Sequence, residues 1–312
     1  MRTCVLSTLL CLATAGFCFG QCVGPSQGTS GRHIRTSDGV DLYLEVRGEG
    51  TPCLYIHGGP GAGGYWLQKF SGDMLERNFQ MIYLDQRGSG RSTSPKDGDY
   101  SIARLVEDFE EVRLALGIKQ WVTLGHSFGG ILQMAYAQRH PQVITGMVML
   151  NCSLDLEESL RGWIPKACEL LGITDPKAYT DEAVPLLDRV GDLVGKLKEK
   201  DLFWKLAYAS QESEKTMDAT FDEVPNFNHD FERAPLTPRE YWADYRKAAQ
   251  EMKMPVLFFY GKTDWRVGPE HYKGVHFPNM MLFGSDVGHV ASLENTADLE
   301  KAVTAYRKRY RL

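Results

Sequence analysis

Three features are scarce or missing in this 312-residue sequence, and each excludes a class of protein. No apolar run after the first twenty residues is long enough to cross a membrane. Positive charge is not in excess, because 35 Lys and Arg face 40 Asp and Glu, which argues against a general affinity for nucleic acid. Only four of the seven cysteines follow residue 20, and their spacing matches no zinc pattern: Cys22, Cys53, Cys152 and Cys168. We therefore expect no metal.

The first twenty residues differ from the rest of the chain. Arg2 precedes the apolar stretch 4–17, and Cys18-Phe19-Gly20 places small residues before a possible cleavage point. This pattern predicts a secretory signal peptide over residues 1–20, cleaved near Gly20–Gln21, and a secreted or periplasmic protein. An uncleaved anchor and a lipid-modified Cys22 are the alternatives. Export permits disulfides, and the sequence does not choose among the three full pairings of four cysteines.

Short apolar runs alternate with segments of helical periodicity. This alternation predicts an α/β fold with a mostly parallel eight-stranded sheet and helices on both faces. The Ser37-Asp38-Gly39 turn indicates that the sheet begins antiparallel. The predicted strands are 32–36, 41–46, 53–57, 80–85, 121–125, 146–151, 255–261 and 280–284, and the clearest helices are 101–116, 130–138 and 296–310.

The alternation stops between about residues 153 and 251. This stretch has amphipathic segments and several aromatic residues, but no clear strand. It predicts a helical cap, inserted after the sixth strand and folded over the carboxyl edge of the sheet. The expected organisation is a core formed by 21–152 and 252–312, with 153–251 as the cap.

The stretch HGGPGAGG, residues 57–64, follows a predicted strand and allows two interpretations. Gly59, Gly61 and Gly64 match G-x-G-x-x-G, and Asp85 lies where a ribose-binding acid would fall. The same loop could instead direct a backbone N–H at a reacting oxygen. The rest of the chain decides between these possibilities.

The stretch GHSFGG, residues 125–130, favours the second interpretation. Ser127 occupies the centre of G-x-S-x-G, between a predicted strand and a predicted helix. In that context the motif is typical of a serine nucleophile, because the sharp turn exposes the hydroxyl and its glycines avoid clashes.

A serine nucleophile needs a base and an acid that orients the base. His289, shortly after the last predicted strand, can return over the sheet edge to Ser127. Asp264 follows the preceding strand, so the order is serine, aspartate, histidine. Asp155 and Asp286 are rival acids, although Asp286 suits the turn itself.

These residues also assign a role to the glycine loop. Two predicted strands precede it, whereas a dinucleotide fingerprint usually opens its sheet, and Pro60 removes an N–H from the supposed cradle. We therefore predict that Gly59 and Phe128 supply the two oxyanion N–H groups, and we expect no cofactor.

Together these stretches resemble the α/β-hydrolase fold and, within it, the proline iminopeptidase family. The resemblance rests on HGGPG (57–61), DQRGSGRS (85–92), GHSFGG (125–130), GKTD (261–264) and GH (288–289), and it covers about residues 30–150 and 253–310. It implies a serine hydrolase that releases N-terminal proline, or another small residue, from small peptides through an acyl-enzyme.

The resemblance is weaker in the cap, where the family binds the substrate's amino group with glutamates. Phe227 begins the stretch FNHDF at the place of one such glutamate, and the nearby candidates are Glu212, Glu214, Glu223 and Glu232. A carboxylesterase or amidase acting on small apolar acyl substrates is therefore the alternative, and a non-catalytic binding protein is a more remote one.

Overall fold

The computed structural model describes residues 31–312. The predicted signal peptide, its cleavage site and Cys22 lie outside the described residues. Within them, no helix is long and apolar enough to span a membrane, and no group of His, Cys, Asp and Glu residues could hold a metal ion.

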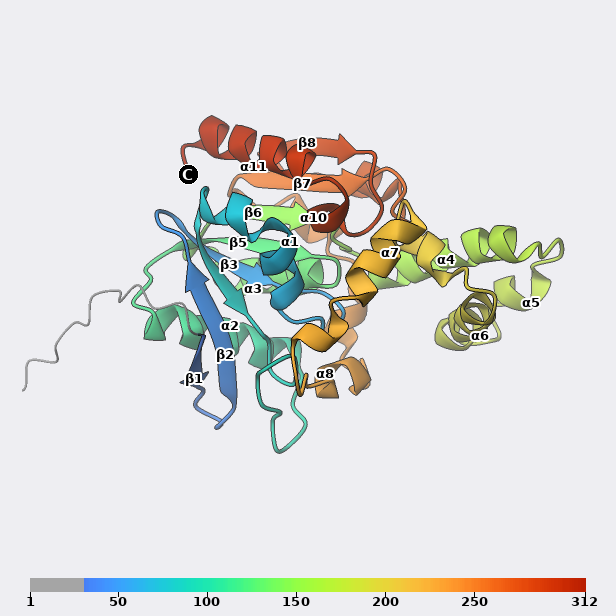
Figure 1. The fold of residues 1–312 in the computed structure, drawn as a ribbon, viewed down its shortest axis with the longest axis horizontal. Helices are drawn as coiled ribbons and strands as arrows, with labels where there is room; N and C mark the ends of the chain where they lie inside the picture. Colours follow the sequence, from blue (N-terminus) through green and yellow to red (C-terminus); the bar gives the residue numbers. More distant parts are fainter. Residues whose placement is uncertain (1–30) are drawn as a thin grey trace, which may run out of the picture. The chain divides into compact units, whose positions relative to one another are not determined.

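A single eight-stranded sheet runs through the described chain (Figure 1). Its strand order is β1-β2-β4-β3-β5-β6-β7-β8; β2 runs antiparallel to both of its neighbours, and the other adjacent pairs are parallel. The predicted α/β fold, its mostly parallel sheet and its antiparallel beginning are thereby confirmed. The strands are β1 (Arg32–Arg35), β2 (Asp41–Arg47), β3 (Pro52–Ile56), β4 (Gln80–Leu84), β5 (Trp121–His126), β6 (Ile144–Leu150), β7 (Val256–Gly261) and β8 (Met280–Ser285).

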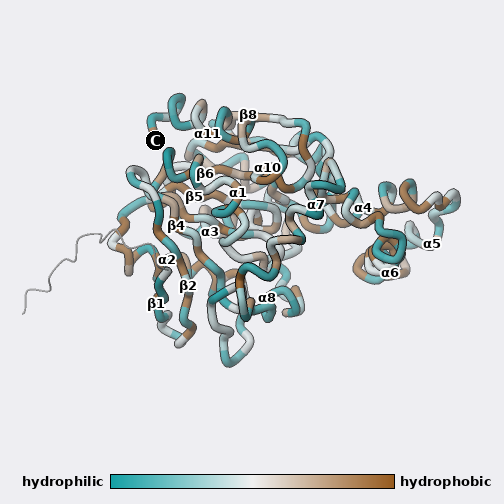
Figure 2. The backbone as a smooth tube through the Cα atoms, in the orientation of Figure 1, coloured by the Kyte–Doolittle hydropathy of each residue, from teal (hydrophilic) through white to brown (hydrophobic). Residues whose placement is uncertain are grey.

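Both faces of the sheet are buried, which explains the near-continuous apolar runs of the central strands (Figure 2). Along β3, Leu54 and Ile56 face one hydrophobic cluster, while Cys53 and Tyr55 face the other. This alternation is the two-residue period of a strand. The first cluster is completed by α2 (Ile102–Ala115) and α3 (Gly129–Arg139), and the second by α1 (Tyr65–Glu76), α10 (Ala291–Glu294) and α11 (Thr296–Tyr310).

The chain between β6 and β7 contains helices and turns but no strand, as the sequence predicts for a cap. Part of it forms a separate hydrophobic cluster around Trp163, Leu193 and Leu206. The helices here are α4 (Leu156–Leu171), α5 (Lys177–Thr180), α6 (Leu186–Glu199), η1 (Phe203–Leu206), α7 (Gln211–Asp218), η2 (Phe221–Glu223), α8 (Asp230–Arg233), η3 (Arg239–Trp242) and α9 (Arg246–Ala249), and η4 (His271–Gly274) follows β7.

Three of the four cysteines considered for disulfides are buried as free thiols in different places. Cys152 lies in the first sheet cluster, Cys53 in the second and Cys168 in the cap cluster. Because each belongs to a separate cluster, they form no disulfide with one another.

Candidate active site

Ser127 stands on the turn that joins β5 to α3. Its φ is +56°, a left-handed conformation that a non-glycine residue adopts only where the surroundings enforce it. The Ser127 N–H donates to the Leu150 carbonyl at 3.2 Å, and its own carbonyl accepts from Gly130 and Ser153. The neighbouring strand β6 therefore fixes this turn from one side.

The glycines of the motif are required by close packing around the turn. A Cβ at Gly129 would lie 2.1 Å from the Ile56 carbonyl oxygen, and one at Gly125 would lie 2.5 Å from the Gln133 Oε1. A Cβ at Gly129 would collide with the backbone of β3, so the first turn of α3 can approach that strand only because this residue is glycine. The Gly125 contact is with the end of the buried Gln133 side chain.

His289 reaches Ser127 from the loop after β8, as the sequence predicts. Its Nε2 lies 2.8 Å from the Ser127 Oγ, and its Nδ1 lies 3.0 Å from the Asp264 Oδ2. The structure thus brings the three predicted residues into one hydrogen-bonded series, although Asp264 and Ser127 lie 25 and 162 positions from His289 in the sequence. Asp264 and His289 are buried, and Ser127 is half-buried.

The Asp264 carboxylate accepts hydrogen bonds at both oxygens. Oδ1 accepts from the N–H groups of Arg266 and Val267, at 2.9 and 3.2 Å, and Oδ2 accepts from the Asn151 Nδ2 at 2.9 Å. Burial acts to raise the pKa of Asp264, but His289 and these donors lower it below its usual value. The carboxylate is therefore ionised and held in place for the imidazole.

The rival acids lie in other interactions. Asp155 caps the N-terminus of α4 and forms an ion pair with Arg246 at 2.8 Å. Asp286 is largely exposed, and it pairs with Lys262 at 2.9 Å. Neither carboxylate contacts His289, so the geometry favours Asp264.

The loop that carries His289 is fastened by a helix residue and by the cap. Glu294 accepts from the Gly288 N–H at 2.6 Å and from the Ala209 N–H at 2.7 Å. The His289 N–H donates to the Ala207 carbonyl, while the His289 carbonyl accepts from the His126 Nε2 at 2.9 Å. Burial and the nearby His289 lower the pKa of His126 to about 4, so this imidazole is a neutral donor.

The glycine loop lies directly against the serine turn. A Cβ at Gly58 would meet the Ser127 Cβ at 2.8 Å and the Phe128 nitrogen at 3.3 Å. Neither the Gly59 N–H nor the Phe128 N–H donates a hydrogen bond within residues 31–312. Two free donors next to the serine are what an oxyanion site requires.

His57 ties the glycine loop to the loop that follows β4. Its Nδ1 donates to the Gly58 carbonyl at 3.0 Å, and its Nε2 accepts from the Gln86 N–H at 3.0 Å. Burial lowers the pKa of His57, in keeping with this neutral tautomer. Asp85 accepts from the Gly64 N–H at 2.6 Å and from Arg91, so the acid considered for ribose binding already has partners in the protein.

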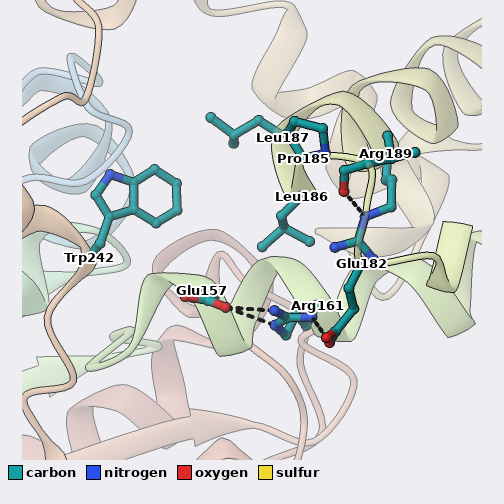
Figure 3. A pocket seen from close by; sticks show the side chains of 9 residues that line it. Glu157, Arg161, Glu182, Pro185, Leu186, Leu187, Arg189 and Trp242 are labelled. Atoms are coloured by element: carbon teal, nitrogen blue, oxygen red, sulfur yellow. Dashed lines mark hydrogen bonds and ion pairs between the residues drawn. The ribbon is translucent and has the colours of Figure 1, made fainter.

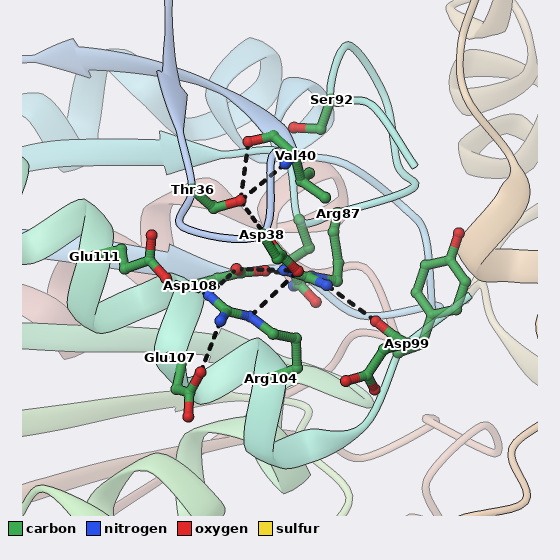
Figure 4. Close-up of polar contacts among 12 residues, drawn as sticks. Thr36, Asp38, Val40, Arg87, Ser92, Asp99, Arg104, Glu107, Asp108 and Glu111 are labelled. Carbon is green, nitrogen blue, oxygen red and sulfur yellow. Dashed lines mark hydrogen bonds and ion pairs between the residues drawn. The ribbon is translucent and has the colours of Figure 1, made fainter. Parts of the chain in front are cut away.

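The loop after β4 rests on a buried network of charges, which we call the arginine network: Asp38, Arg87, Arg104 and Asp108 (Figure 4). Arg87 makes a two-pronged contact with Asp108, with N–O distances of 2.6 and 2.7 Å, and a third bond to Asp38 at 2.9 Å. The Asp99 carbonyl accepts a fourth bond at 3.0 Å. The network holds the DQRGSGRS loop in place, and no member of it contacts Ser127 or His289.

The four cap glutamates have different surroundings. Glu223 pairs with Lys69 at 2.5 Å and Glu232 with His229 at 2.8 Å, whereas Glu212 is exposed. Glu214 is half-buried, has no cation partner within the described chain and shows a raised pKa, chiefly from burial. Phe227 packs on Trp66, with ring centroids 5.4 Å apart, and Asn228 pairs with Gly90.

A cavity of about 400 Å³ lies elsewhere on the cap, between α4 and α6 (Figure 3). Its charged lining already has partners, because Arg161 contacts both Glu157 and Glu182, and Arg189 donates to the carbonyls of Val184 and Tyr179. Ser127, Asp264 and His289 do not line this cavity.

The family model described as the alpha/beta hydrolase fold matches residues 51–296, most of the chain and all the residues of the serine series. The chain belongs to the α/β hydrolase fold family. Its curated relatives include the proline iminopeptidase of Neisseria gonorrhoeae, 36% identical over 43% of this chain and 44% of that protein. The probable proline iminopeptidase of Streptomyces coelicolor is 38% identical over 37% and 38% of the two chains. The chain thus spans less than half the length of these relatives.

Solved structures of α/β hydrolases align over more of the chain. The proline iminopeptidase-related protein of Thermus thermophilus has a TM-score of 0.73 at 22% identity, covering 89% of this chain and 97% of that one. An esterase of Exiguobacterium antarcticum has a TM-score of 0.66 at 18% identity, covering 89% and 100%. These similarities support the fold.

Sequence reasoning found the serine series but missed several residues that surround it. Asn151, at the end of β6 with φ of +48°, donates to both Asp264 and the Gly288 carbonyl. The sequence signal that could have identified Asn151 is its position directly after a buried strand. Glu294, Tyr208 and Arg266 had no motif to mark them.

Proposed function

We propose that this chain is a serine hydrolase in which Ser127 is the nucleophile, His289 the general base and Asp264 the orienting acid. The observation that carries the proposal is the hydrogen-bonded series Ser127–His289–Asp264 on a strained turn. A serine with an adjacent base oriented by a third group is the arrangement that nucleophilic catalysis requires.

In the proposed reaction, the His289 Nε2 takes the Ser127 proton while Oγ attacks the substrate carbonyl carbon. The Gly59 and Phe128 N–H groups bind the resulting oxyanion. The imidazolium then gives its proton to the departing group, the bond to that group breaks and an acyl-enzyme remains. Water, activated by the same imidazole, releases the acid and restores Ser127.

Replacing Ser127 with alanine tests this assignment. We expect a loss of about a million-fold in rate, with an unchanged circular dichroism spectrum and melting temperature. A variant that kept a tenth of the wild-type activity would contradict the nucleophile assignment.

We further propose that the substrate is a short peptide with a free N-terminal proline or another small residue. The resemblance of the motif loops to proline iminopeptidases supports this, as do two glutamates. Glu214 lacks a cation partner within the described chain, and Glu232 lies against Gly61 with an exposed and readily exchanged histidine partner. A carboxylate of this kind can bind the substrate ammonium through a charge-assisted hydrogen bond.

Free and N-acetylated prolyl arylamides test this substrate. Such a bond contributes about 1.5–3 kcal/mol, and an unpaired carboxylate adds a penalty, so we expect at least about a hundred-fold preference for the free amine. Glu214→Gln or Glu232→Gln should abolish the preference. Glu223→Gln is the matched control, because Lys69 already pairs with that carboxylate.

A carboxylesterase or amidase acting on small apolar acyl groups is the second candidate. The aromatic contact of Phe227 with Trp66, where a glutamate would stand in the proline iminopeptidases, favours it. Equal rates on free and acetylated substrates, with fast cleavage of p-nitrophenyl esters, would decide for this candidate.

A further inference from the structure

Arg266 is a charged residue beside the serine series, and the Asp264 carboxylate is its electrostatic partner within the described chain. It lies two residues after Asp264, and its guanidinium makes no hydrogen bond or ion pair within residues 31–312. Its Cζ instead stands 4.3 Å from the ring centroid of Trp163 and 5.1 Å from that of Phe203, both in the cap. The guanidinium therefore occupies a mostly apolar setting with its donors unused.

The backbone of Arg266 is firmly positioned. Its N–H donates to the Asp264 Oδ1 at 2.9 Å, and its carbonyl accepts from the Trp163 Nε1 at 2.9 Å. Burial lowers the pKa of Arg266 to about 10, and the residue still carries its charge at neutral pH. The guanidinium makes no hydrogen bond to an anion within the described chain, and a bound carboxylate would supply that interaction.

Tyr208 places a second unused donor in the same region. Its hydroxyl makes no hydrogen bond within the described chain. Burial and the nearby carboxylates of Asp218, Glu214 and Glu294 raise the pKa of Tyr208 to about 12, so it stays protonated. Its backbone lies against Gly288, next to His289. Arg266 and Tyr208 are both partly exposed, so neither residue is sealed inside the protein.

The backbones of both residues adjoin the His289–Asp264 pair. Arg266 follows the acid that holds His289, and Tyr208 follows Ala207, whose carbonyl accepts from the His289 N–H. The departing group receives its proton from the His289 Nε2 and so leaves on this side. An anion bound here belongs to the leaving group rather than to the acyl group.

We propose that Arg266 binds a carboxylate in the leaving group of the substrate, with the Tyr208 hydroxyl as a second donor. A guanidinium suits a carboxylate because its N–H groups match the two oxygens. The preferred substrates are then dipeptides and tripeptides, whose free carboxyl end lies close to the bond that is cleaved. This inference rests on the proposed hydrolase function.

A purely structural role for Arg266 makes a different prediction. If the guanidinium only fastens the cap through Trp163 and Phe203, removing it should lower the melting temperature and affect all substrates equally. A binding role should affect only substrates that carry the carboxylate, and it should act through KM.

The experiment compares a prolyl dipeptide with a free carboxyl end and its C-terminal amide, in wild type and in Arg266→Gln, Arg266→Lys and Lys262→Gln. Lys262→Gln removes an exposed charge from the same turn and is the matched control. We expect wild type to favour the free carboxylate about ten- to hundred-fold in kcat/KM. Arg266→Gln should erase this preference through KM, Arg266→Lys should retain part of it and Lys262→Gln should leave it unchanged.

Two results would overturn this inference without contradicting the proposed function. The first is equal kcat/KM on the two dipeptides in wild type, which needs no variant to fold. The second is an equal loss on both in Arg266→Gln. The proposed function itself would be contradicted if wild type cleaved neither prolyl arylamides, whose leaving group is uncharged, nor p-nitrophenyl esters.

Discussion

Arg87 is fully buried and Arg266 is half-buried, and the two side chains have different surroundings. The Arg87 guanidinium donates to the Asp108 and Asp38 carboxylates of the arginine network and to the Asp99 carbonyl. Arg266 lies against two aromatic rings, its guanidinium makes no hydrogen bond or ion pair within residues 31–312, and Asp264 is its electrostatic partner. A fully paired charge is suited to holding a loop in place, whereas an unpaired one beside a reactive serine is suited to binding something else.

This contrast separates two regions with different expected responses to mutation. Changes in the arginine network should lower stability and leave catalysis intact. Changes at the serine edge, defined as Ser127, Asp264, Arg266 and His289, should lower activity and leave the fold intact.

After Ser127→Ala, the largest expected effect in this comparison is that of Asp264→Asn. Loss of the carboxylate allows the wrong tautomer of His289, so kcat should fall about ten-thousand-fold while the melting temperature changes little. Steady-state kinetics checks this, with Asp155→Asn and Asp286→Asn as controls that should stay active. A nearly silent Asp264→Asn beside an inactive Asp155→Asn would place the acid one strand earlier.

Asp108→Asn should have the next largest effect, on stability instead of rate. The substitution removes the carboxylate that accepts two hydrogen bonds from Arg87 and leaves a buried guanidinium without its main counter-ion. The free energy of unfolding should fall by about 3–5 kcal/mol. Urea denaturation measures the loss, and kcat/KM should change less than about threefold. Asp38→Asn is the milder control, because its side chain is 29% exposed. A loss of activity as large as the loss of stability would remove the distinction between the two regions.

The smallest expected effect concerns acid. Burial lowers the pKa of His126 to about 4, so between about pH 6.5 and pH 4 the unfolded chain binds more protons than the folded protein. The free energy of unfolding should therefore fall as the pH drops through this range, by about 2–3 kcal/mol from this residue.

His126→Gln should reduce that acid sensitivity, since glutamine does not titrate. Urea denaturation of wild type and variant at pH 7, 5.5 and 4.5 makes the comparison. His57 is buried, its pKa is lowered too, and it should account for part of the remaining slope. Identical slopes in the two proteins would show that His126 is not held neutral.

The sequence predicted the sheet and the serine series because both follow from local rules. Strands covered on two faces need continuous apolar runs, and all eight predicted strands are present with ends shifted by two residues or fewer. Ser127, Asp264 and His289 each follow a strand, and parallel strands end at one edge of a sheet. The geometry brings the three side chains together, and their catalytic role stays a proposal.

The residues around the serine series could not be predicted in the same way. Arg266 and Tyr208 acquire their setting from the way the cap packs over the sheet edge, which has no fixed spacing in the sequence. The cap contains 3₁₀ turns and four-residue helices such as α5, α8 and α9, too short to show a helical period. Asn151 depends on a left-handed backbone that the residue type permits but does not demand.

The three buried thiols Cys53, Cys152 and Cys168 allow local unfolding to be measured separately in three parts of the molecule. Burial raises the pKa of Cys53, Cys152 and Cys168, so none of them reacts with an alkylating reagent until its own cluster exposes it. Each thiol reports on a different compartment: one face of the sheet, the other face, or the cap. Labelling rates read by mass spectrometry would therefore record local opening at three places in the unmodified sequence. Fast labelling of Cys168 together with slow labelling of Cys53 and Cys152 would mean that the cap cluster opens locally while the sheet clusters stay closed.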